Sequence, residues 1–137
     1  MKNLLLLFLC AGLFLGSSKA LEKDKSAQGT AGTQSKLRYG IASYYAKKFS
    51  GRLTATGSVY DPNKYTAACN VLPLRTWIRV TNLRNNKSVI VKVTDRLHRN
   101  NKRLVDLSFV AAKELGYVSR GLTKVQVEVL RNYSPPK

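Results

Sequence analysis

The chain has 137 residues, with 24 Lys and Arg against 7 Asp and Glu and a formal net charge of +17. This length allows one compact domain and excludes a large barrel, a two-domain nucleotide enzyme and a long repeat array. Hydrophobic residues make up 44% of the sequence, so the composition predicts a folded domain with a small core rather than a disordered chain.

The first twenty residues have the layout of a secretory signal peptide. A short basic start precedes the apolar run 4–15, and small residues lead from there to Ala20. The run of 12 residues is too short to span a bilayer, so we expect export with cleavage near Ala20 and no stable membrane anchor. Lipid attachment at Cys10 is disfavoured because the bulky Leu9 precedes it. The expected location is the periplasm or the extracellular cell envelope.

Cleavage would leave residues 21–137 as the mature chain, with 22 basic and 7 acidic residues and a net charge of +15. Cys69 would then be its only thiol, which excludes an internal disulfide. Two interpretations of Cys69 stay open at this point. It is either a small buried hydrophobic residue or an exposed reactive thiol.

The positive charge predicts an affinity for polyanions. Nucleic acid is one such partner, because Lys and Arg neutralise its phosphates. However, the basic residues are scattered along the chain rather than grouped with aromatic residues, and the chain carries an export signal. We therefore expect anionic polymers of the cell envelope as partners, no nucleic acid, and a monomeric protein.

The predicted elements begin after a linker. Residues 21–38 are polar and small without periodicity, which predicts a flexible linker before a domain at 39–131 and a tail at 132–137. The first predicted strand covers 39–45. Asp61, which precedes a proline, predicts a helix cap at the start of one short helical turn.

Period-two alternation dominates the second half of the chain. It predicts strands at 77–83, 87–94 and 125–129, with the first two joined by a tight hairpin through Asn85 and Asn86. One helix is predicted between a Ser108 cap and a Gly116 stop. Several strands and one or two short helices in about 90 residues favour a small closed β-barrel, since closure removes exposed strand edges.

Nine short segments follow one another in a distinctive order. They are GIASYY (40–45), GRLTATG (51–57), YD (60–61), TAA (66–68), LPL (72–74), RVTNL (79–83), VTDR (93–96), VDLS (105–108) and AA (111–112). In this order and spacing the chain resembles the rare lipoprotein A (RlpA-like) family over 39–131. The resemblance implies a mainly β domain, a six-stranded double-psi β-barrel related to the catalytic half of expansins. It also implies a lytic transglycosylase that cuts peptidoglycan glycan strands, favours strands free of peptide stems, and leaves 1,6-anhydro-muramic ends.

The chain departs from the family pattern at its polar positions. The Asp-Arg pair of the family's Asp-Arg-Gly-Pro motif is kept as Asp95 and Arg96, but a Leu-His pair ending at His98 replaces Gly-Pro. Ser58 stands where the family carries a Glu, and Cys69 stands where it carries a His. These changes leave open an alternative, in which the chain is a non-catalytic module that binds peptidoglycan or loosens the wall.

Lytic cleavage makes small demands on the protein. The attacking group is the muramic 6-hydroxyl of the substrate itself, so one carboxyl could protonate the leaving oxygen and then accept the hydroxyl proton. This role is predicted for Asp95, whereas Asp106 is predicted to order the chain before the helix. The basic residues close to Asp95 in sequence argue against this role if they surround its side chain. No metal or cofactor is expected, and the predicted binding residues are Tyr44, Tyr45, Arg52, Ser58, Tyr60, Arg96 and His98, with the tyrosines as a floor for sugar rings.

Overall fold

The computed structural model describes residues 35–137. The expected signal peptide and residues 21–34 of the expected linker lie outside the described residues. The described elements are six strands, one α-helix and one turn of 3₁₀-helix. They are β1 (Arg38–Tyr44), η1 (Lys47–Phe49), β2 (Thr66–Ala68), β3 (Trp77–Asn82), β4 (Ser88–Asp95), β5 (Val105–Leu107), α1 (Phe109–Leu115) and β6 (Thr123–Val129).

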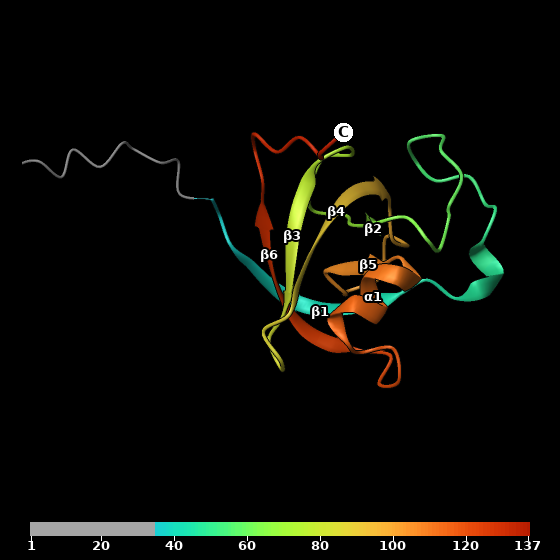
Figure 1. Ribbon diagram of the computed structural model, residues 1–137. Coiled ribbons are helices and arrows are strands. Elements are labelled where there is room, and N and C mark those ends of the chain that lie inside the picture. The colour runs from blue at the N-terminus through green and yellow to red at the C-terminus, as the bar shows by residue number, and fades with distance from the viewer. Residues whose placement is uncertain (1–34) are drawn as a thin grey trace, which may run out of the picture. The chain divides into compact units, whose positions relative to one another are not determined.

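The six strands close into one barrel in the order β1-β5-β2-β4-β3-β6 (Figure 1). Two neighbouring pairs, β1 with β5 and β2 with β4, run parallel, and the other four pairs are antiparallel. Because every strand has a neighbour on both sides, the barrel leaves no unpaired edge. The closed six-stranded barrel confirms the mainly β fold that the sequence predicts.

The barrel interior is filled by β-branched residues that alternate along the strands. Val91 and Val93 of β4 and Val125 and Val127 of β6 are fully buried, as the period-two pattern predicts. The residues between them on β4 face outward, and among these are Lys92 and Thr94. Because of this alternation, each strand has one face in the core and one outward face whose side chains can contribute to a binding or catalytic site.

Two positive φ angles mark turns that the sequence predicts. Asn86 adopts φ 58° in the turn between β3 and β4, and Gly116 adopts φ 75° where α1 ends. Ser108 occupies the N-cap position of α1 but makes no capping hydrogen bond through its side chain. Instead, the backbone N–H of Phe109 donates to the phenol oxygen of Tyr60 at 3.3 Å, which ties the helix to the segment before β2.

The predicted helical turn at Asp61 is wrong. The Asp61 carboxylate accepts a hydrogen bond from the backbone N–H of Asn63 at 2.8 Å, which closes a turn with no helix after it. The second short helix of the described chain is η1, just after β1. Cys69 is fully buried in the barrel core, in agreement with the first of the two interpretations.

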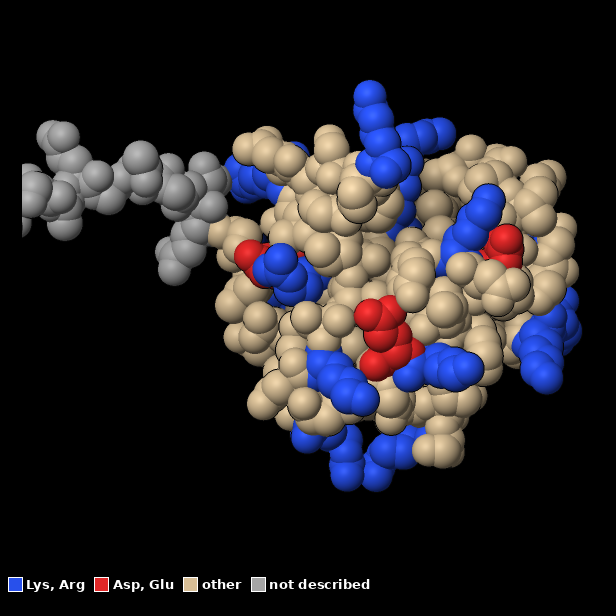
Figure 2. All heavy atoms as spheres, viewed as in Figure 1, with Lys and Arg blue, Asp and Glu red and all other residues tan. Residues whose placement is uncertain are grey.

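On the face shown in Figure 2, basic side chains are spread out rather than gathered in one patch. Figure 2 shows Lys and Arg around the whole visible face, with a few Asp and Glu between them. The ion pairs within residues 35–137 join Arg79 to Glu128 and Arg103 to Asp106. In this same part of the chain, neither helix has the length and apolar character needed to cross a bilayer.

Candidate active site

The chain between β1 and β2 forms a hairpin that packs against the end of β4. The backbone N–H of Thr54 donates to the carbonyl of Ser58 at 2.7 Å, and that of Tyr60 donates to the carbonyl of Arg52 at 2.8 Å. Gly57 turns the hairpin with φ 83°, a conformation that favours glycine. This segment is the teal and green loop at the right of Figure 1.

Asp95 ends β4 beneath this hairpin, and its carboxylate accepts three hydrogen bonds. The Tyr45 hydroxyl donates to Oδ2 at 2.7 Å. The backbone N–H groups of Ala55 and Arg96 donate to Oδ1 at 3.0 and 2.8 Å. Because these donors come from three different segments, the carboxylate has one fixed orientation.

The Asp95 carboxylate has no ion-pair partner among its basic neighbours in sequence. The guanidinium of Arg96 turns away and donates to the carbonyls of Cys69 and, at 2.6 Å, Leu72. Within residues 35–137, no Lys or Arg forms an ion pair with Asp95. The Asp95 carboxylate is therefore held by hydrogen bonds and not by an ion pair, and Arg52, Arg96 and Arg103 line the same groove.

Asp95 lines a groove of about 620 Å³, here called the Asp95 groove. Seven of the eight predicted site residues lie along it, and Ser58 is the exception. The predicted residues in the groove are Asp95, Tyr44, Tyr45, Arg52, Tyr60, Arg96 and His98, and the others are Ala46, Phe49, Leu53, Leu97, Asn101, Arg103 and Asp106.

An aromatic wall stands beside the Asp95 carboxylate. The rings of Tyr45 and Tyr60 stack with centroids 4.4 Å apart, and Phe49 meets Tyr45 edge-on at 5.9 Å. Burial, the hydrogen bond to Asp95 and the charge of that carboxylate raise the pKa of the Tyr45 phenol above its ordinary value. Tyr45 therefore remains a protonated donor at neutral pH.

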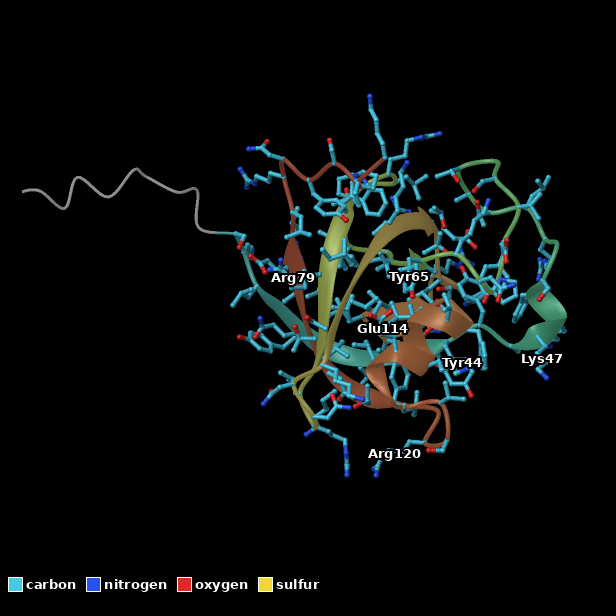
Figure 3. All side chains as sticks on the ribbon, viewed as in Figure 1. Tyr44, Lys47, Tyr65, Arg79, Glu114 and Arg120 are labelled. Carbon is cyan, nitrogen blue, oxygen red and sulfur yellow. The ribbon has the colours of Figure 1, made fainter. Side chains whose placement is uncertain are left out.

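Tyr44 contributes packing more than an open polar group. Its hydroxyl donates to the carbonyl of Val118 at 2.9 Å, and its ring meets Phe109 and Tyr117 edge-on at 6.1 and 6.0 Å. Figure 3 shows Tyr44 close to α1. Only part of this side chain can face a ligand in the groove.

Arg52 and His98 lie on exposed parts of the groove. The Arg52 guanidinium lies 5.2 Å from the centroid of the Phe49 ring, a cation–π contact that keeps it beside the aromatic wall. Nδ1 of His98 accepts a hydrogen bond from the backbone N–H of Asn100 at 3.3 Å. His98 Nε2 is thus the ring nitrogen left to meet a ligand.

Comparison with known proteins places the chain in a family. A family model described as "Lytic transglycolase" matches residues 38–127. The chain belongs to the lytic transglycolase family. The relatives include "Endolytic peptidoglycan transglycosylase RlpA" of Haemophilus influenzae, 50% identical over 97 residues, which are 71% of this chain and 34% of that protein. The protein of that name from Pseudomonas aeruginosa is 53% identical over 89 residues, or 65% of this chain and 26% of its own length.

The chain thus spans about a third, or less, of the curated relatives it matches. Solved structures show the same fold at lower identity. A papain inhibitor from Streptomyces aligns with a TM-score of 0.58 and 22% identity over 70% of this chain and 96% of its own. An expansin from Clavibacter michiganensis aligns with a TM-score of 0.58 and 21% identity over 74% of this chain and 54% of its own. Together with the family match, these likenesses confirm the double-psi β-barrel.

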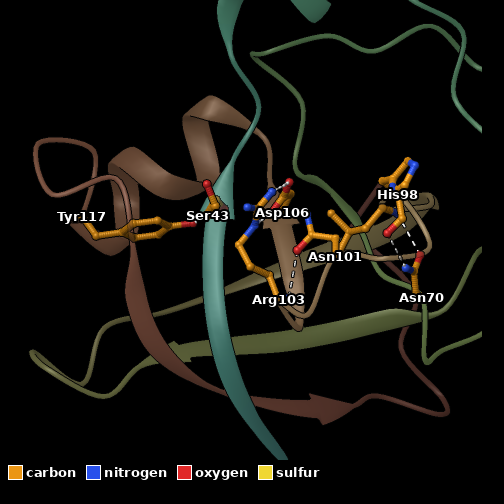
Figure 4. A network of polar contacts seen from close by, with 8 residues as sticks. Ser43, Asn70, His98, Asn101, Arg103, Asp106 and Tyr117 are labelled. Carbon is orange, nitrogen blue, oxygen red and sulfur yellow. Dashed lines mark hydrogen bonds and ion pairs between the residues drawn. The ribbon is translucent and has the colours of Figure 1, made fainter.

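This member of the lytic transglycolase family places a second carboxylate in the groove, which the sequence argument missed. Ala68 of β2 pairs with Asp95 on one side and with Asp106 on the other. The Asp106 carboxylate accepts two hydrogen bonds from the Arg103 guanidinium, both of 2.8 Å (Figure 4). The alternation of Asp106 with the buried Val105 and Leu107 puts it on the outer strand face, but no local signal shows which strand lies beside it.

Ser58 lies in a separate pocket of about 390 Å³, here called the basic pocket. Its Oγ lies 2.8 Å from the hydroxyl of Thr54 and 2.9 Å from that of Thr56, and these two hydroxyls are 3.0 Å apart. The basic pocket shares Tyr60 with the Asp95 groove. Its full lining is Thr54, Thr56, Ser58, Val59, Tyr60, Asp61, Lys64, Thr66, Arg75, Lys92 and Thr94.

The position that carries His in the family pattern is not part of either lining. Cys69 is fully buried, and its backbone N–H donates to the carbonyl of Asp95 at 3.0 Å. It thus supports the end of β4 from inside the barrel. Across residues 35–137, no three His, Cys, Asp or Glu side chains meet in a way that could hold a metal ion.

Proposed function

We propose that this chain is a lytic transglycosylase that cuts peptidoglycan glycan strands, with Asp95 as its catalytic residue. The observation that carries the proposal is the Asp95 carboxylate, fixed by three donors on the side of an aromatic-walled groove. Membership of the lytic transglycolase family and the names of the relatives support the same activity.

In the proposed reaction, the Asp95 carboxyl delivers a proton to the oxygen that links two sugars. The muramic 6-hydroxyl then attacks the anomeric carbon of its own ring, and Asp95 takes up the hydroxyl proton. This attack is intramolecular, and well-oriented intramolecular reactions reach effective molarities of ~10⁵ M or more. The protein therefore has to position the sugar and move one proton, and it does not have to activate a water molecule.

The other groove residues would bind and orient the strand. The partly exposed ring of Tyr45 offers an aromatic surface against which a sugar ring can pack, and the Tyr45 hydroxyl keeps Asp95 in place. Tyr60 is buried and supports the Tyr45 ring by stacking against it. Arg52, Arg96 and His98 would contribute polar contacts. Of these, Arg52 and His98 have the more open side chains, because the Arg96 guanidinium already bonds two carbonyls.

The proposed setting is the cell envelope. Peptidoglycan lies outside the cytoplasmic membrane, and residues 1–20 have the layout of an export signal. We propose that the chain acts there as an exported monomer, with glycan strands as its partner and with further attraction to anionic envelope polymers from its basic surface.

The test is product analysis by mass spectrometry. Stem-free glycan strands are incubated with the protein at micromolar concentration, and we expect fragments that end in 1,6-anhydro-muramic residues. Hydrolytic reducing ends in place of anhydro ends would contradict the mechanism. If no fragments form while the protein still sediments with intact sacculi, the chain is the non-catalytic binding module.

A further inference from the structure

The basic pocket brings three cationic side chains together with three hydroxyls. Lys64, Arg75 and Lys92 line it, as do the hydroxyl-bearing residues Thr54, Thr56 and Ser58. Within residues 35–137, none of the three cations forms an ion pair or a side-chain hydrogen bond. The one carboxylate in the lining belongs to Asp61, which already accepts a backbone hydrogen bond. The lining therefore has two more positive charges than negative ones.

Backbone contacts hold the two sides of the basic pocket at the end of β4. The N–H of Arg75 donates to the carbonyl of Val93 at 2.7 Å, and the N–H of Thr56 donates to that of Thr94 at 3.1 Å. Arg75 also adopts φ 70°, a left-handed conformation that is uncommon for a residue other than glycine. Lys92 faces outward from β4, with its Nζ 5.7 Å from the centroid of the Trp77 ring. The backbone that carries Arg75 and Lys92 is thus held in place by hydrogen bonds, while the Lys64 and Arg75 side chains are exposed.

The three hydroxyls of the basic pocket lie within hydrogen-bond distance of one another. Thr54 Oγ1 also lies 3.0 Å from the Ser58 carbonyl and can donate to it, so each hydroxyl proton has an acceptor inside the pocket, and a bound oxyanion would replace one of these internal hydrogen bonds. The Ser58 and Thr56 hydroxyls can rotate toward an incoming acceptor. A carboxylate would receive these donors together with the planar guanidinium of Arg75, which fits two carboxylate oxygens at once.

The basic pocket adjoins the Asp95 groove directly. Thr94 lines the pocket and Asp95, the next residue of β4, lines the groove. Tyr60 faces both, and its ring stacks on Tyr45, the residue that bonds Asp95. A polymer in the groove can therefore place a charged substituent in the pocket while a sugar lies beside Asp95.

We infer that the basic pocket is a subsite for the lactyl carboxylate of muramic acid in stem-free glycan strands. This inference rests on the proposed function. A stem peptide converts the lactyl carboxylate into a neutral amide, which removes the charge that the pocket binds. Lys64, Arg75 and Lys92 are then the residues that discriminate bare strands from strands with stems.

The test measures binding in an Asp95→Asn background, so that turnover does not consume the strands. The variant is Arg75→Asn/Lys92→Gln, in which Asn tolerates the positive φ. The matched control is Arg84→Asn/Lys124→Gln, which removes the same charge from exposed positions outside both hollows. The probes are stem-free strands as free acids, and the same strands coupled to methylamine so that each lactyl group is a neutral amide.

We expect the pocket variant to bind free-acid strands about tenfold more weakly, as after the loss of one charge-assisted hydrogen bond, and the control to change less than about twofold. Amidated strands should bind weakly to every variant, with no further loss in the pocket variant. Equal binding of acid and amide strands, or equal losses in both variants, would overturn the inference. Competition by inorganic phosphate without any acid–amide difference would also overturn it, in favour of a phosphate ligand. Because cleavage is not part of the readout, this result stands apart from the product analysis.

Discussion

The Asp95 groove and the basic pocket are neighbouring cavities that differ in how their charged side chains are hydrogen-bonded. In the groove, Asp95 has three donors and Asp106 has a bidentate partner in Arg103. In the basic pocket, the cations Arg75 and Lys92 have no hydrogen-bonded partner in the described chain. The two carboxylates of the groove are thus fixed by hydrogen bonds, whereas the guanidinium of Arg75 and the ammonium of Lys92 are not.

This difference follows from what each hollow has to do under our proposals. A proton-transferring carboxyl must hold its orientation within a few tenths of an ångström, so bonds from several segments are an advantage. A site that recognises a charged substituent must keep its donors free until the substituent arrives, because every internal partner competes with the ligand. Substitutions in the groove should therefore change the rate of cleavage, and substitutions in the basic pocket should change binding.

Among the substitutions in the groove, Asp95→Asn should reduce the rate of cleavage the most. Asn keeps an oxygen for the backbone N–H groups of Ala55 and Arg96, so we expect the fold to persist. Cleavage should fall by about a thousandfold, within the ~10²–10⁴ range of general acid–base contributions. Release of anhydro ends measures the loss, and strand binding measures what remains. A variant that binds as the wild type does and cuts equally fast would remove Asp95 from the mechanism.

A smaller effect is expected from Tyr45→Phe, which removes only the hydroxyl that bonds Asp95 Oδ2. The aromatic stacking with Tyr60 stays. Because a hydrogen bond to a charged group is worth about 1.5–3 kcal/mol, we expect kcat to fall about 10- to 100-fold with little change in KM. Steady-state kinetics on stem-free strands separates these two quantities.

Tyr44→Phe is the matched control for that experiment. Its hydroxyl donates to the Val118 carbonyl and does not touch Asp95. We expect this variant to lose about 1 kcal/mol of unfolding free energy and to keep its kcat. If Tyr44→Phe and Tyr45→Phe slow cleavage equally, the effect is general loosening of the aromatic wall, and Tyr45 is not a positioning residue.

The sequence predicts the barrel well because its signals are local. The alternating valines at 89–93 and 125–127 mark core faces, and Asn86 and Gly116 mark turns through the left-handed conformation that their residue types tolerate. The helix at 109–115 also lies where its apolar stripe and its stop signal place it. Each of these features depends on residues a few positions apart.

The site is less predictable because its contacts join distant segments. Tyr45 and Asp95 are 50 residues apart, and only the barrel order brings Asp106 to the other side of Ala68. Ser58 follows a motif shared with the family, yet hairpin geometry turns its hydroxyl into a different pocket from Asp95. Motif order therefore identified the segments that carry candidate site residues, and it could predict neither how the strands pair nor which pocket each side chain faces.

The smallest expected effect is a change in the pH dependence of the free energy of unfolding. Burial is the main cause that raises the pKa of Tyr45 and of Tyr117, and nearby carboxylates add to it: mainly Asp95 for Tyr45, and Asp106 for Tyr117. In the unfolded chain both phenols would ionise at their ordinary pKa of about 10. Above that pH the unfolded state binds fewer protons than the folded state, so the free energy of unfolding should decline as pH rises. Below about pH 10 this contribution is complete and constant.

Urea unfolding between pH 8 and pH 11 measures this decline. Tyr45→Phe and Tyr117→Phe each remove one phenol that resists ionisation, so each variant should show a shallower decline than the wild type, and the double variant the shallowest. Phe at position 117 also gives up the hydrogen bond to the Ser43 carbonyl, which lowers stability at every pH and leaves the slope as the informative quantity. Identical slopes in all four proteins would mean that the phenol of Tyr45 can lose its proton beside Asp95, and that the groove does not hold its polar groups as firmly as the three bonds to that carboxylate imply.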